Sequence, residues 1–184
     1  EIVDNCQKRP QRLFEERELS VDECAGYLQK AINLLKSQTA ASDGSEGTLK
    51  VIITVSPIRY AKYGFHGSQL SKATLLLAAD KLVKENPGVV SYFPAYEIMN
   101  DELRDYRFYK EDMLHPSEQA VEYIWERFRA TYFGKAAEQF LEDWRPIREA
   151  LGHKPFHPES EEHQKFIART EEKKRQFEEK YHLL

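Results

Sequence analysis

The feature that most constrains the fold of this chain is a pair of strand-like runs with a helical pattern between them. Residues 50–55 (KVIITV) are almost continuously apolar and β-branched, which is typical of a strand buried on both faces of a parallel sheet. Residues 70–84 repeat apolar side chains at helical spacing, and residues 89–98 form a second strand candidate that Pro94 shortens. The order strand, helix, strand predicts a right-handed βαβ unit.

Helical patterns surround this unit. Ser20 and Glu23 have the spacing of a capping box, so a helix is expected from Ser20 to about residue 37. Beyond residue 116, helical patterns cover residues 117–133 and 135–151. A strongly charged tail at residues 159–180 is expected to form a solvated helix that lies on the surface or reaches a partner.

Two strands are too few for a stable parallel sheet, because both faces and both edges of such a sheet need cover or partners. Either further strands escape recognition in the sequence, or the chain is the second half of a larger domain. We expect the second, since the sequence begins at Glu1 without a methionine, within what reads as structured protein.

Charge and apolar content exclude several classes of protein. The chain has 27 Lys and Arg against 31 Asp and Glu, a net charge of −4, so nucleic acid and membrane surfaces are not expected as partners. The longest apolar runs fall far short of the roughly 20 residues that a bilayer span needs, and the N-terminus does not resemble a signal peptide. Cys6 and Cys24 lack the spacing of a zinc site, so we expect no metal, and reduced thiols favour a cytoplasmic location.

The sharpest candidate for chemistry is the pair formed by Asp112 and His115. His115 precedes Pro116, which suits the first position of a helix, so its imidazole is expected at a loop-to-helix junction after the last strand, where open α/β sheets bind ligands. Asp112 can accept a hydrogen bond from the Nδ1–H of the ring, which fixes the tautomer and stabilises the imidazolium when Nε2 takes a proton. The spacing alone is more typical of helix capping beside a surface histidine.

Other candidates lie in loops. Arg59 and His66 follow the first strand at the same expected edge, where Arg59 could clamp an anion or a sugar hydroxyl, or form an ordinary ion pair, and His66 could shape a pocket. Asn5 could donate to an oxyanion or serve in a turn. Ser56 lacks the glycines of a nucleophile elbow, and its hydroxyl is expected to bond nearby backbone. A group of aromatic residues could stack on a sugar, although core packing is favoured: Tyr92, Phe93, Tyr96, Tyr106, Phe108 and Tyr109.

Several longer strings resemble the GSCFA-domain family, with a dense match from about residue 3 to residue 133. They are TVSPIR (54–59), His66, QLSKATLLLA (69–78), YFPAYEI (92–98), DELRDYRFY (101–109) and DMLHPS (112–117). The family is similar to the SGNH/GDSL hydrolases, which have a three-layer α/β/α, flavodoxin-like fold. The resemblance implies an α/β fold in which residues 1–133 are the C-terminal part of such a domain and residues 134–184 are a helical C-terminal extension.

The resemblance also implies a serine ester hydrolase, in which Asp112 and His115 match the orienting acid and the general base. The Gly-Ser-Cys-Phe-Ala string that holds the family's expected nucleophile does not occur in the 184 residues. We therefore expect part of an esterase or deacetylase that acts on an acyl ester or an O-acetylated carbohydrate and needs no cofactor. The chain alone is expected to be inactive, and to pair with the missing N-terminal part or with a second copy.

The alternative is a non-catalytic module that binds a carbohydrate or a protein. The absent serine favours this alternative, and so do the aromatic and basic residues near the expected cleft. The upstream sequence discriminates the two hypotheses: a Gly-Ser string preceded by an apolar strand supports catalysis, and its absence supports binding.

Overall fold

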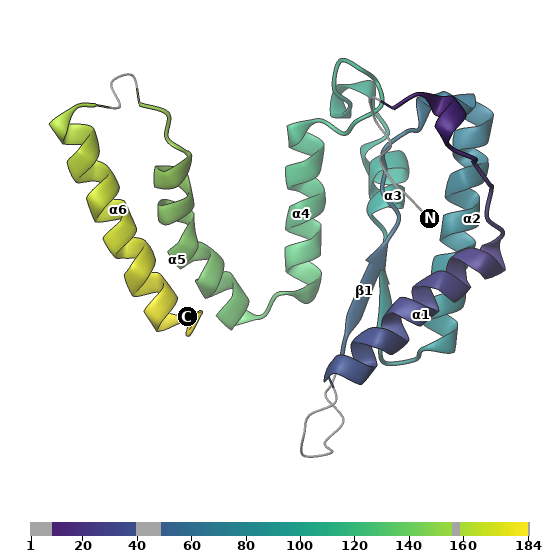
Figure 1. Ribbon diagram of the computed structural model, residues 1–184, viewed down its shortest axis with the longest axis horizontal. Helices are drawn as coiled ribbons and strands as arrows, with labels where there is room; N and C mark the ends of the chain where they lie inside the picture. The colour runs from purple at the N-terminus through teal and green to yellow at the C-terminus, as the bar shows by residue number, and fades with distance from the viewer. Residues whose placement is uncertain (1–8, 40–48, 156–158, 184) are drawn as a thin grey trace. The chain divides into compact units, whose positions relative to one another are not determined.

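The computed structural model describes residues 9–39, 49–155 and 159–183, which divide into two compact units, Glu1–Ile124 and Trp125–Leu184 (Figure 1). The first unit contains α1 (Val21–Thr39), β1 (Val51–Thr54), α2 (Gly64–Glu85), β2 (Val90–Phe93), α3 (Ala95–Glu97) and the π-helical turn η3 (Ile98–Leu103). Its short 3-10 turns are η1 (Gln11–Leu13), η2 (Ala61–Tyr63) and η4 (Tyr106–Phe108). α4 (Glu118–Tyr132) begins in the first unit, and α5 (Lys135–Gly152) and α6 (Glu161–Lys180) belong to the second.

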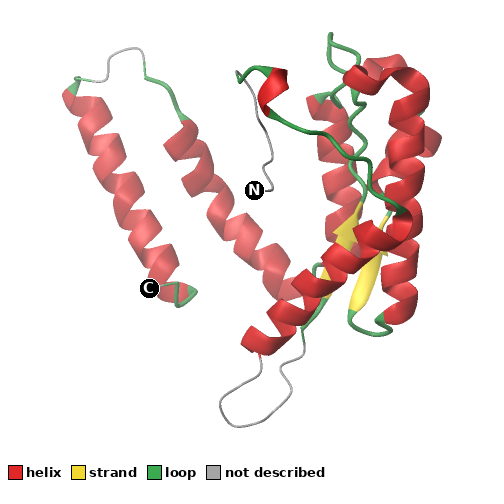
Figure 2. Ribbon diagram, turned by 45° about the vertical axis from the view of Figure 1, so that its right-hand side comes forward, coloured by secondary structure: helices red, strands yellow, loops and turns green. Residues whose placement is uncertain are grey.

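The two strands pair in parallel, from Val51 beside Val90 to Thr54 beside Phe93. α2 connects them, and Figure 2 shows the strands side by side next to the helices of this unit. The predicted strand, helix, strand order with parallel pairing is therefore confirmed. Within the described residues the sheet has these two strands, so the fold is of the α/β kind, with a small sheet and much helix.

The core of the first unit lies between α1, α2 and one face of the sheet. Its buried members are small or branched apolar residues that interlock across the three elements: Ala25, Ile32, Ala78, Leu82 and Val90. Val51 and Ile53 of β1 pack against this cluster, as does Val83 of α2. Packing of both helices against the same core holds α2 in a fixed position beside the strands.

The opposite face of β1 is open, which corrects one expectation. The run at residues 50–55 predicts a strand buried on both faces, but burial alternates along β1, and Ile52 remains 39% exposed. The reason is that alternate strand residues point to opposite faces: Val51 and Ile53 pack against the helical core, whereas Ile52 and Thr54 point away from it.

The start of α1 follows the predicted capping box. The Glu23 backbone N–H donates to Ser20 Oγ at 3.2 Å, and the Ser20 backbone N–H donates to Glu23 Oε2 at 2.9 Å. These bonds satisfy two of the backbone donors that a helix start leaves without an intrahelical partner. They also help to lower the pKa of Glu23 to about 2.

Two predicted boundaries are wrong. α2 begins at Gly64, not at residue 70, because the turn η2 feeds directly into the helix through Gly64, whose φ of 67° is in the left-handed region. The second strand ends at Phe93, not at residue 98, because Pro94 has no N–H to continue the ladder and its carbonyl instead accepts the first helical bond, from Ile98.

The second unit is built on α5 and α6, which run antiparallel (Figures 1 and 2). Phe140 and Trp144 of α5 contact the ring of Phe177 on α6, and Tyr181 joins this cluster. The charged tail is thus a helix, as predicted, and it packs on α5 through a narrow apolar stripe. The boundary predicted after residue 133 falls between α4 and α5. No helix within the described ranges is long and apolar enough to cross a membrane.

The core predicts a contrast between two leucines of α2. Leu82 is fully buried, whereas Leu77 is 57% exposed. Leu82→Ala should lower the free energy of unfolding by about 2–5 kcal/mol, because it leaves a cavity, and Leu77→Ala should change it by less than about 0.5 kcal/mol. Urea unfolding followed by far-UV circular dichroism measures both. Equal effects of the two substitutions would contradict the packing described here.

Candidate active site

The segment from Phe108 to Ser117 closes on itself and forms a compact loop. Ser117 N–H donates to the Phe108 carbonyl at 2.7 Å, and Lys110 N–H donates to the His115 carbonyl at 2.8 Å. A short antiparallel bridge joins Tyr109 and Pro116 between them. These bonds fix residues 111–114 as a tight turn at the loop's tip, so the side chains of the turn are held by backbone geometry rather than by burial.

Asp112 organises this turn from within. Its Oδ1 accepts the backbone N–H groups of Leu114, at 2.9 Å, and of His115, at 3.0 Å, while its Oδ2 lies 2.6 Å from His115 Nδ1. The backbone N–H of His115 is the strongest cause that lowers the pKa of Asp112 to about 2, followed by that of Leu114 and then by the imidazole. One carboxylate therefore fixes the turn and the imidazole together.

This geometry assigns the proton on the imidazole. A carboxylate with a pKa of about 2 is ionised at neutral pH and can only accept hydrogen bonds. Nδ1 of His115 must then be the donor, which leaves Nε2 unprotonated in the neutral ring. The side chain of His115 is 53% exposed, and in the described part of the chain its Nε2 has no partner. The pair can accept a proton from a hydroxyl that approaches from solvent or from another segment.

Arg59 joins the loop after β1 to this turn. Its backbone N–H donates to the Leu114 carbonyl at 3.1 Å, and its Nη1 lies 3.4 Å from the Met113 carbonyl. The guanidinium lies 4.2 Å from the centroid of the Tyr109 ring and 5.9 Å from that of Tyr106. The structure thus brings the predicted residue Arg59 together with the Asp112–His115 turn, where it supplies positive charge and part of the turn's support.

The other predicted site residues are not brought to this turn. His66 is exposed in the first turn of α2, and none of the contacts that join Arg59 to the turn involves it. Asn5 lies outside the described residues. Ser56 is exposed, and its Oγ accepts the Ile58 N–H at 3.3 Å, which is the backbone bond expected of it. The catalytic and binding roles of these residues stay predictions.

The aromatic group divides between core and surface. Phe93 is buried, as core packing predicts, whereas Tyr106 is 68% exposed at the edge of the Arg59 stack. Tyr92 Oη donates to Glu97 Oε2 at 2.9 Å, and burial together with this carboxylate raises the pKa of the phenol. Among the described residues, no group of three or more His, Cys, Asp and Glu side chains is arranged to hold a metal ion.

Sequence reasoning missed Lys72, which is only 9% exposed in α2. Its Nζ donates to the Ser56 carbonyl at 2.6 Å. Ser56 lies just after the end of β1, in the loop that also contains Arg59. A signal was present in the pattern, because Lys72 lies seven residues before the buried Ala79, which places both on one helix face. A lysine on the buried face of a helix indicates a specific buried acceptor.

The hydrogen bonds of the turn determine the pH range in which Asp112 stabilises it. Its pKa of about 2, against an ordinary value of 3.8, means that the ionised carboxylate stabilises the turn above pH 3.8 and that this contribution is lost as the pH falls through about 2. Because backbone donors are the larger cause, His115→Ala should leave the pKa of Asp112 well below 3.8. Carboxyl ¹³C NMR across this range measures both values. A return to 3.8 in the variant would mean that the imidazole alone sets the pKa.

The sequence of this chain matches two models of known protein families. A model described as the GSCFA family matches residues 1–128, and one described as the GSCFA domain protein, C-terminal domain, matches residues 144–184. Neither the curated proteins nor the solved structures include a significant match. The first model covers more than half of the chain and includes the Asp112–His115 turn. The resemblance seen in the sequence is confirmed, and this chain belongs to the GSCFA family.

Proposed function

We propose that this chain supplies the general base and the orienting acid of a serine ester hydrolase of the SGNH/GDSL type. The observation that carries the proposal is the 2.6 Å contact between Asp112 Oδ2 and His115 Nδ1, in a turn that leaves Nε2 open. The serine comes from a segment outside the 184 residues, in the Gly-Ser-Cys-Phe-Ala string of the family. That segment also contributes the remaining layers of a three-layer α/β/α domain.

The proposed reaction is an acyl transfer in two steps. The serine Oγ attacks the acyl carbonyl while His115 Nε2 takes the hydroxyl proton, and the imidazolium then gives this proton to the leaving alcohol. Water next attacks the acyl-serine while Nε2 takes its proton, and the imidazolium returns this proton to the serine Oγ as the acyl–oxygen bond breaks and the carboxylic acid leaves. Asp112 stays ionised throughout and stabilises the imidazolium, which suits its pKa of about 2. Every step is a proton or acyl transfer, so the proposal includes no metal or organic cofactor.

The surroundings of the pair support an O-acetylated carbohydrate as substrate. Tyr106 exposes its ring beside the guanidinium of Arg59. Tyr60 and Tyr63, which follow Arg59 in the chain, are also exposed, and the centroids of their rings lie 4.7 Å apart in an edge contact. Exposed tyrosine rings stack on sugar rings, and a guanidinium donates to sugar hydroxyls or to an acyl oxygen. The same surface supports the second candidate, a non-catalytic module that binds a carbohydrate.

The open sheet supports the proposed partner. The face of β1 with Ile52 and Thr54 is uncovered in the described residues, although parallel sheets occur almost only with both faces covered. Each of the two strands also has only one neighbour within the described residues. We propose that the serine-bearing segment covers this face and adds strands at the edges of the sheet, which brings the serine to the carboxyl edge where β1 leads into the Arg59 loop. A second copy of the chain is the alternative occupant, and sedimentation of the chain with and without that segment separates the two.

Loss of the base is the direct test of the proposal. In a polypeptide that contains these residues and the Gly-Ser-Cys-Phe-Ala segment, His115→Ala should lower kcat/KM for p-nitrophenyl acetate by about 10²- to 10⁴-fold. His182→Asn, which changes a histidine of the second unit, is the matched control and should retain full activity. The 184-residue chain by itself should not hydrolyse the ester.

Two results would contradict the proposal. Undiminished turnover in the His115→Ala variant would exclude His115 as the base, and hydrolysis by the 184-residue chain alone would exclude an outside nucleophile. Binding of an acetylated oligosaccharide without any hydrolysis, in wild type and variant alike, would favour the non-catalytic module.

A further inference from the structure

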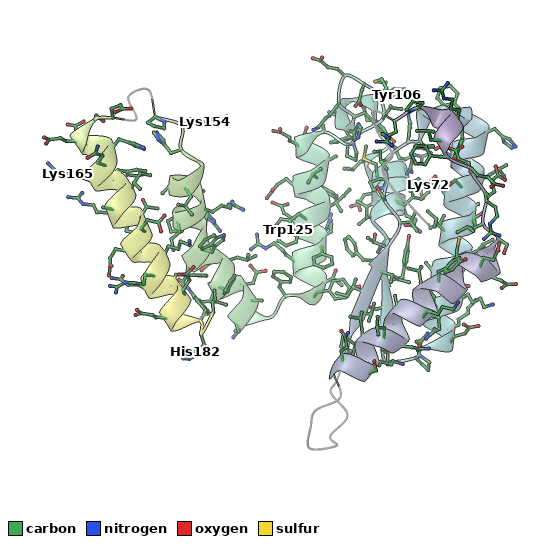
Figure 3. All side chains as sticks on the ribbon, in the orientation of Figure 1. Lys72, Tyr106, Trp125, Lys154, Lys165 and His182 are labelled. Atoms are coloured by element: carbon green, nitrogen blue, oxygen red, sulfur yellow. The ribbon has the colours of Figure 1, made fainter. Side chains whose placement is uncertain are left out.

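α2 holds the loop after β1 at two points, one turn of helix apart. Lys72 Nζ donates to the Ser56 carbonyl at 2.6 Å, and Ser68 Oγ accepts the Tyr60 N–H at 3.2 Å. Both α2 residues are more than nine-tenths buried, and Figure 3 labels Lys72 on the strand-facing side of the helix. Because Ser56 and Tyr60 lie at the two ends of loop 56–60, the whole loop is fixed to α2.

Burial of the Lys72 side chain costs free energy, because it takes a charged group out of water. Within the described residues its ammonium has a backbone carbonyl as its hydrogen-bond acceptor and no carboxylate, and burial lowers its pKa. An apolar side chain of similar length would fill the same space without desolvating a charge. What the ammonium adds is a charge-assisted hydrogen bond, which is stronger and more directional than a neutral one. The charge therefore serves to position the Ser56 carbonyl.

The fixed loop in turn supports the Asp112–His115 turn. Arg59 lies between the two anchored positions, and it donates through its backbone to the Leu114 carbonyl and through Nη1 to the Met113 carbonyl. These same two peptide groups donate through their N–H groups, those of Leu114 and His115, to Asp112 Oδ1. Hydrogen bonds on both sides of the covalent backbone of loop 56–60 thus connect α2 to the imidazole.

We propose that Lys72, with Ser68, is a positioning residue that holds the Asp112–His115 pair in place through loop 56–60. The role as a positioning residue for catalysis rests on the proposed function, in which His115 is the base. The mechanical part of the proposal stands independently of that function: loss of the Lys72 ammonium loosens the turn but leaves the core of α2 intact.

The test is amide hydrogen exchange by NMR on the ¹⁵N-labelled 184-residue chain. Lys72→Met keeps the length and removes the charge, and it should speed exchange at Arg59, Leu114 and His115 by about tenfold or more, as expected for loss of a hydrogen bond to a charged group. Exchange at Leu82, in the core of α2, should not change. The matched control is Lys84→Met, because Lys84 is exposed on the same helix and pairs with Asp80; it should leave all these rates unchanged.

Ser68→Ala is the second variant, and it carries the test if Lys72→Met does not fold. It removes the other anchor with a small volume change, and it should speed exchange at the same amides. Unchanged exchange at Arg59, Leu114 and His115 in the folded variants would overturn the proposal. A uniform increase that includes Leu82 would also overturn it, since that result assigns Lys72 to general packing.

A kinetic readout distinguishes failure of this proposal from failure of the proposed function. In the polypeptide that contains the serine segment, Lys72→Met should lower kcat at least about tenfold with little change in KM, and Lys72→Arg should restore part of the loss. Absence of hydrolysis in the wild type would refute the function, while the exchange rates still decide whether Lys72 positions the turn. Equal kcat in wild type and Lys72→Met would refute the catalytic role of Lys72.

Discussion

The parallel pairing of β1 with β2 is the constraint on which the rest of the first unit depends. Two parallel strands need a crossover that returns the chain to the starting edge, and α2 is that crossover. Packing of α2 on α1 and on the sheet fixes the helix. The loops that follow both strands then emerge at one edge, so Arg59, which follows β1, can contact a turn 54 residues later, at Met113.

The Asp112–His115 pair is almost independent of this framework in its internal geometry. Asp112 binds two backbone N–H groups and an imidazole that are all within three residues of it. What the framework adds is placement, because Arg59 ties the turn to the end of β1 and Lys72 ties that loop to α2. A locally formed pair that is held at the carboxyl edge of a sheet is the arrangement that the proposed mechanism requires.

Local patterns in the sequence predicted local structure well. The capping box at Ser20 and the contact between Asp112 and His115 each join residues three apart, so both bonds lie within the short range that local patterns can predict. The strand order followed from apolar periodicity. The helical register of Lys72 indicated that it is buried, but the exposure of Ile52 and the choice of the Ser56 carbonyl as acceptor depend on which elements pack together, and no spacing along the chain encodes that. The early start of α2 was missed because glycine and aromatic residues at 63–67 are typical of loops.

The central claim is that His115 is the base that activates a serine. The most direct measurement is the rate at which a fluorophosphonate labels that serine in a polypeptide containing both the serine segment and these residues, since phosphonylation needs an activated hydroxyl and no substrate recognition. The account predicts labelling of one serine in the Gly-Ser-Cys-Phe-Ala string, at a rate that falls by about 10²-fold or more in His115→Gln. Labelling of that serine at the same rate in wild type and His115→Gln would contradict it.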